Sequence, residues 1–128
     1  MKINIETIGH QLQRYDTCGD YWNDPDGTEQ IRVSNLPDPK MEKLISIHEM
    51  IEKFLVECKG IDIKTIDDFD INFERERALG LHDADEECGF DPSAPYFKEH
   101  AIATKIERML AREVGVDWNK YSNEVNNL

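Results

Sequence analysis

The chain has 128 residues, and its 27 Asp and Glu against 15 Lys and Arg give a formal net charge of -12. A protein that binds duplex nucleic acid needs cationic side chains to replace the counterions of the phosphates, so this excess of acids argues against nucleic acid as a partner. With 39% hydrophobic residues the chain is too apolar for a disordered acidic tail, and we expect one globular domain over residues 1–128.

The first 35 residues carry the pattern of β-strands. Ile3 and Ile5 alternate with polar residues, which is typical of a strand with two unlike faces. Residues 24–27 read Asp-Pro-Asp-Gly, a turn signal, because proline presets one turn dihedral and glycine accepts a positive φ. We therefore predict a hairpin of residues 20–23 and 28–34, which joins the Ile3 segment in a small N-terminal antiparallel β-meander.

From residue 38 the apolar residues recur with the period of a helix. Three main helices are predicted, from Pro39 to Gly60, from Thr65 to Leu79 and from Pro95 to Val114, followed by a short C-terminal helix from Trp118 to Val125. Asp38 and Asp117 are the expected N-caps of the first and last helices, and Gly115 is the expected C-terminal cap of the third. Residues 81–95 are predicted to form an exposed acidic loop. The fold class is therefore α+β.

Cellular setting is indicated by two further features of the chain. No stretch approaches the roughly 18 to 20 apolar residues that a membrane span requires, and residues 1–6 lack the apolar run of a signal peptide. We therefore expect a cytoplasmic protein that binds no membrane. The cysteines form no CxxC pair, so we expect reduced thiols, with Cys58 in the core and Cys18 and Cys88 in loops.

A histidine lies in the middle of the apolar stripe predicted for the first helix. At the helical period, five apolar residues fall within about 60° of His48: Met41, Leu44, Ile45, Ile51 and Leu55. Glu52 shares this stripe, where an ionised carboxylate is costly unless it is paired or binds a metal. His48 and Glu52, at i and i+4, can reach one ion, while Glu49 lies at the edge of the stripe. Together they form the motif HExxE.

The third predicted helix carries a matching face. His100 and Glu107 lie two turns apart on one stripe, and small residues such as Ala103 between them would let another helix approach closely. If the first and third helices pack together, their polar groups would meet at one place.

That meeting would assemble a metal site. We expect His48, Glu52 and His100 to hold zinc or another divalent metal, with an open position for water. Glu49 is then the candidate general base, and Glu107 is a carboxylate behind the ligands or an additional ligand.

The strand Gln30 to Ser34, followed by the segment Leu-Ile-Ser-Ile-His-Glu-Met-Ile-Glu at residues 44–52, resembles the strand and HExxH helix of zincin-like metallopeptidases. Glu52 stands where those enzymes have their second metal-binding histidine. The resemblance implies ligands at His48 and Glu52, a general base at Glu49, and metal-dependent hydrolysis of a peptide substrate.

Over nearly its whole length the chain also resembles small uncharacterised proteins encoded by phages and prophages. The segments that carry this second resemblance are residues 96–101, 106–108 and 115–118. It implies a phage or prophage origin and the host cytoplasm as the setting.

Other interpretations of the same residues stay open. HExxE is a short pattern in a chain rich in Glu, and His48, Glu52, His100 and Glu107 could form a structural polar network in a non-enzymatic phage accessory protein that acts through a protein partner. Residues 83–87 of the acidic loop would then be the contact surface.

A third interpretation is a nucleotide hydrolase with carboxylates around magnesium, for which Glu52, Asp70, Glu74 and Glu107 are candidates, although the sheet and the histidines fit it less well. Otherwise we expect Asp70 and Glu74 to form a solvated or salt-bridged edge beside Arg77. The oligomeric state stays open.

Overall fold

The order of strands and helices follows the predicted α+β pattern. The computed structural model describes residues 1–128. Three strands form one sheet: β1 (Ile3–Ile8), β2 (Gly19–Asn23) and β3 (Glu29–Ser34). Four helices follow: α1 (Pro39–Cys58), α2 (Ile63–Ala78), α3 (Phe97–Glu113) and α4 (Trp118–Asn126). There are also two short 3-10 turns, η1 (His10–Leu12) and η2 (Cys88–Phe90). The fold class is therefore confirmed.

The sheet is mixed, so the predicted purely antiparallel meander is wrong. β2 and β3 do form the predicted hairpin, with Gly27 at φ 87° in its turn. β1 instead pairs in parallel with the other edge of β3, where Ile5 lies opposite Ile31. The connection over residues 9–18 is long enough to pass from one edge of the sheet to the other, which a tight turn could not do. Alternation reveals the faces of a strand but not its neighbour or direction.

The helices begin and end within two residues of the predicted positions, and their caps explain why. The Asp38 carboxylate accepts a hydrogen bond from the Lys40 amide, and the Asp117 carboxylate accepts one from the Lys120 amide. After α3, Gly115 has φ 72° and the Val116 amide donates to the carbonyl of Ala111 at 2.8 Å. These contacts satisfy backbone groups that a helix end leaves without partners.

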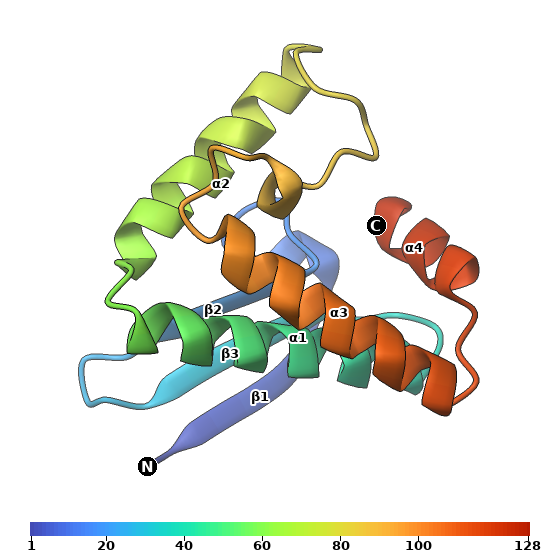
Figure 1. Cartoon of the computed structure of the whole chain (residues 1–128), viewed down its shortest axis with the longest axis horizontal. Coiled ribbons are helices and arrows are strands. Elements are labelled where there is room, and N and C mark those ends of the chain that lie inside the picture. The colour runs from blue at the N-terminus through green and yellow to red at the C-terminus, as the bar shows by residue number, and fades with distance from the viewer.

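Helix α1 packs against the sheet on one side and against α3 on the other (Figure 1). α1 and α3 run antiparallel, because Lys59 contacts Glu99 at one end of the pair and Lys40 contacts the Val114 carbonyl at the other. Ala103 has 0% of its surface exposed at this contact. The predicted packing of these two helices through small residues is confirmed.

The cysteines follow the prediction in part. Cys18 and Cys88 lie half-buried outside the strands and the four helices, as expected. Cys58 is exposed, so its placement in the core was wrong. It is the last residue of α1, where the chain leaves the layers that cover the middle of the helix. No helix in the structure has the length and apolar composition needed to cross a bilayer.

Closeness of the two helices at Ala103 leads to a first prediction. Ala103→Leu adds three carbons where there is no space, so we expect the free energy of unfolding to fall by about 1–3 kcal/mol. Ala101→Leu is the matched control, because Ala101 is exposed on the same helix. Its effect should stay within about 0.5 kcal/mol. Denaturant unfolding of both variants measures the difference, and equal values for the two would contradict this account of the packing.

Candidate metal site

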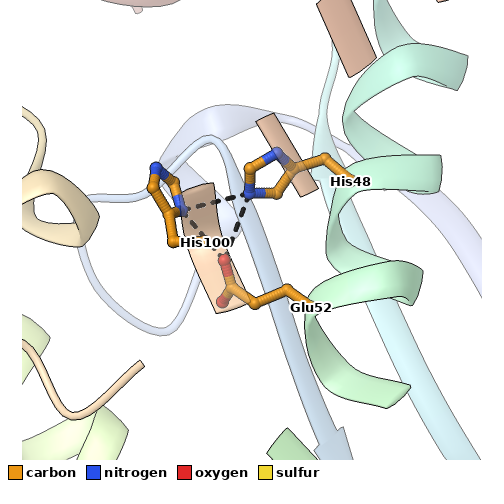
Figure 2. Close-up of side chains that lie close together, drawn as sticks. All are labelled: His48, Glu52 and His100. Atoms are coloured by element: carbon orange, nitrogen blue, oxygen red, sulfur yellow. Dashed lines mark hydrogen bonds and ion pairs between the residues drawn. The ribbon is translucent and has the colours of Figure 1, made fainter. Parts of the chain in front are cut away.

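Three side chains converge between α1 and α3 (Figure 2). The His48 Nε2 atom lies 3.2 Å from Glu52 Oε2 and 3.2 Å from His100 Nδ1, and His100 Nδ1 lies 2.9 Å from Glu52 Oε2. Ligands at about 2.0–2.1 Å from a tetrahedral zinc ion are about 3.3 Å apart. The three atoms are therefore spaced as the ligands of one small ion would be. Sequence analysis selected these three residues, and the fold brings them together.

Local structure explains how each side chain reaches this point. His48 and Glu52 project from the same face of α1, one turn apart, as Figure 2 shows. His100 comes from the first turn of α3, and its ring packs against Gly89 of η2. A Cβ atom added to Gly89 would lie 2.5 Å from the Cγ atom of His100, which is closer than real contacts allow. A glycine is therefore required there to let the backbone approach the imidazole.

A chain of hydrogen bonds stands behind His48. Its Nδ1 atom lies 2.6 Å from Glu107 Oε2, and the other oxygen of Glu107 accepts a hydrogen bond of 2.6 Å from the Tyr121 hydroxyl. All three side chains are buried. Carboxylates in this position fix the orientation of a metal-binding imidazole and increase its basicity. Glu107 thus lies behind His48 and is not one of the three converging side chains.

The other two converging side chains also have partners on their far sides. Glu52 Oε1 accepts a hydrogen bond of 2.9 Å from the Tyr21 hydroxyl of β2. His100 Nε2 lies 3.2 Å from Glu87 Oε2 in the loop before α3. Sequence analysis missed Tyr21, Tyr121 and Glu87 as parts of the site. No spacing along the chain could have indicated them, because each comes from a different element and reaches the site only in the folded protein.

Glu49 lies beside the trio and not within it. It is bonded to neither imidazole, in contrast to Glu52. Its carboxylate packs against Gly19 at the start of β2, where an added Cβ atom would lie 2.4 Å from Glu49 Oε1. The side chain lines the same cavity, of about 250 Å³, that the three converging residues line. This placement puts the Glu49 carboxyl group at the cavity without a hydrogen bond to either imidazole.

Burial and hydrogen bonding oppose each other in setting the pKa values here. Burial alone lowers the pKa of His48, but its bonds to Glu107 and Glu52 outweigh this effect and hold the pKa well above the usual range. In the same way, the bonds of His100 to Glu52 and Glu87 raise its pKa to about 9. Burial raises the pKa of Glu52, yet the two imidazoles lower it to about 2. Burial, followed by the charge of Glu52, raises the pKa of Glu49 to about 8.

Asp70 corrects the sequence analysis, which placed it on a solvated edge. Asp70 is buried in the cavity wall and accepts hydrogen bonds from Tyr96 at 2.5 Å and Tyr15 at 3.1 Å. Burial raises the pKa of Asp70 to about 6. The spacing of apolar residues along α2 indicated the face that carries Asp70. It could not indicate that the loop of residues 9–18 covers this face, because that contact forms only in the folded protein. Glu74 pairs with Arg77 at 3.0 Å, as expected.

The four carboxylates considered for magnesium do not form one group. Glu74 is paired with Arg77, and Asp70 is bonded to two tyrosines. Glu52 bonds to the two imidazoles, and Glu107 bonds to His48 and Tyr121. Histidine nitrogens therefore dominate the place where ligand atoms converge, which suits zinc better than magnesium.

Comparisons with protein-family models, with curated proteins and with solved structures found no match to this chain. The resemblances to zincin-like metallopeptidases and to phage-encoded proteins therefore stay predictions.

Stability of the metal-free protein should depend on pH in a defined direction. The pKa of His100, about 9, is above its ordinary value of 6.5, so its stabilising contribution is complete below pH 6.5 and is lost as the pH rises through 9. Glu49 keeps its proton up to about pH 8 in the folded state but only to about 4.5 when unfolded, so its contribution is also lost as the pH rises. Glu52 acts in the opposite sense, and its contribution is lost only as the pH falls from 4.5 toward 2.

We therefore expect the melting temperature of chelator-treated protein to fall most steeply between pH 6.5 and 8, where the His100 and Glu49 contributions both decline. Glu49→Gln, which removes one of the two titrations, should flatten this decline. Thermal melts monitored by circular dichroism across this range provide the measurement, and a melting temperature that rises with pH would refute the assignment.

The close contact between Gly89 and His100 gives another prediction. Gly89→Ala should push the His100 imidazole away from His48 and Glu52. If the three side chains bind zinc, the affinity should fall by about tenfold or more, in the range seen when the support of a metal ligand is lost. Asp85→Ala, an exposed change in the same loop, should leave the affinity unchanged. Competition titration with a fluorescent zinc chelator measures both. Equal affinities would show that Gly89 does not hold the ring in place.

Proposed function

We propose that the protein is a metal-dependent hydrolase whose ion is held by His48, Glu52 and His100. One observation carries the proposal: three ligand atoms from two helices lie 2.9 to 3.2 Å apart, and each ligand side chain is held from behind by a further hydrogen bond. Two imidazoles and one carboxylate form a ligand set used by zinc hydrolases, in which a fourth position stays open for water or substrate.

A metal ion accounts for this arrangement better than protons do. Without an ion, the raised pKa values of His48 and His100 place two imidazolium groups with their nitrogens 3.2 Å apart, and like charges at this distance repel. A divalent ion would take the place of both protons and keep the attraction to Glu52. The donors are also those that zinc favours, in the spacing it favours.

Each residue around the ion then has its own part in hydrolysis. A bound zinc ion polarises a carbonyl group and lowers the pKa of water, which is the chemistry it supplies to hydrolysis. The charge of the ion would favour the ionised form of Glu49, which without metal keeps its proton to about pH 8. The Glu49 carboxylate would then take the proton from the attacking water and pass it to the leaving group, as a general base and then a general acid. Glu107 and Glu87 hold the two imidazoles in place, and the Tyr21 hydroxyl orients the Glu52 carboxylate.

Elemental analysis of protein purified without a metal-binding tag tests the site itself. We expect about one equivalent of zinc or another transition metal, together with a melting temperature that falls on chelation. His48→Ala and His100→Ala should lose the metal. His82→Ala is the matched control and should retain it, because His82 lies outside the trio and contacts Glu76. If the His48→Ala variant keeps one equivalent, the ligand assignment is wrong.

Glu49 allows the hydrolytic step to be separated from metal binding. Glu49→Gln should retain one equivalent of metal and lose about 10²- to 10⁴-fold in turnover of any peptide or ester that the wild-type protein cleaves. Its partner control is Glu113→Gln, an exposed change far along α3, which should leave turnover unchanged. Protein that binds no metal and gains no stability from it would instead favour the structural network and an accessory role through protein contacts.

A further inference from the structure

We propose that the substrate of this site is cationic: a peptide or related amide with an amine or guanidinium group close to the bond that is cleaved. This inference rests on the proposed function and names its substrate class. It follows from the charges in the wall of the cavity onto which the metal ligands open.

Carboxylates dominate that wall. Besides the ligand Glu52, eight carboxylate side chains line the cavity, and they come from the loop after β1, from β2, from three helices and from the acidic loop. The eight are Asp16, Asp20, Glu49, Asp67, Asp70, Glu74, Glu87 and Glu107. A single guanidinium, that of Arg77, lies among them, and the lining contains no lysine.

Arg77 cannot serve as a receptor for an anion. Its Nε and Nη2 atoms donate to the two oxygens of Glu74 at 3.0 and 3.2 Å. Its remaining N–H groups donate to backbone carbonyls of the acidic loop, at Asp83, Ala84 and Glu86. A guanidinium has five N–H donors, and all five are used. A phosphate or carboxylate in the cavity would therefore find no free cationic side chain.

The negative charge persists after the internal pairs are counted. Arg14 donates hydrogen bonds to Asp20 at 2.7 and 2.8 Å and also donates to Asp67, so it neutralises one of these two negative charges. Arg77 neutralises the charge of Glu74. A divalent ion removes two more charges. With neutral imidazoles and Glu49 counted as protonated, four of the other eight negative charges are left without a cation. Burial of several of these groups makes their field stronger than it would be in water.

Asp70 marks the place where a substrate cation would meet this charge. Its buried carboxylate is held by the hydroxyls of Tyr15 and Tyr96. The ring of Tyr96 packs edge-on against that of His100, with centroids 5.9 Å apart, so Asp70 lies one aromatic ring away from a metal ligand. A substrate bound at the ion can therefore place a side chain or terminal amine against this wall.

Zinc-binding hydroxamates provide a direct test, because they isolate the charge of the side chain. The probes are the hydroxamates of N-acetyl-lysine, N-acetyl-norleucine and N-acetyl-glutamate, titrated into the zinc-loaded full chain by calorimetry. We expect the lysine probe to bind most tightly and the glutamate probe most weakly, with at least about a tenfold difference at low salt that shrinks in about 0.5 M NaCl.

Two variants connect the preference to the cavity. Asp70→Asn and Asp16→Asn each remove one charge from the wall, and each should reduce the lysine-to-glutamate ratio by about threefold or more. Asp16 has 69% of its side chain exposed at the rim, so Asp16→Asn decides the question if Asp70→Asn fails to fold. Glu113→Gln removes a charge outside the cavity and should leave the ratio unchanged.

The outcomes separate this inference from the proposed function. Equal affinities for the three probes, or tighter binding of the glutamate probe, would overturn the cationic substrate while leaving the hydrolase in place. A lysine preference that both wall variants retain in full would overturn its assignment to this cavity. If zinc is bound but no hydroxamate binds, the ion has no open position, and the proposed function fails together with this inference.

Discussion

The hydrogen bond between His48 and Glu107 is the contact on which the organisation of the site depends. It joins the middle of α1 to the middle of α3, and both partners are buried. A buried charge is costly unless its partner is in place, so the two helices are stable only in the register that brings these groups together. Closely packed alanines make that approach possible, and the polar pair sets where along the helices it occurs.

From this contact the polar network extends outward through every layer of the molecule. Tyr121 binds the free oxygen of Glu107 from α4, and Tyr21 binds Glu52 from the sheet. The acidic loop supplies Glu87 to His100, while Arg77 of α2 holds the carbonyls of the same loop. Almost every element therefore contributes to the orientation of the three converging side chains. Hydrogen bonds from several directions restrict the orientations that these side chains can take.

Local chemistry made part of this structure predictable. Apolar periodicity and the caps at Asp38 and Asp117 placed the helices, and the HExxE spacing together with the small residues of α3 selected the converging trio. The rest depended on tertiary contacts. Nothing in β1 indicates that it pairs in parallel with β3, because a strand shows its faces and not its neighbour. Asp70 looked like an edge residue because the loop that covers it lies about fifty positions away in the chain.

The hydrogen bond from Tyr121 has a consequence for how the protein matures. The site draws its parts from Tyr21 near one end of the chain to Tyr121 near the other, so a nascent polypeptide on the ribosome cannot present the full set until α4 has emerged. Before that point Glu107 lacks the hydrogen bond from Tyr121 that holds its second oxygen. The complete network around the three converging side chains therefore exists only after α4 has packed against α3, and a chain without α4 lacks its last hydrogen bond.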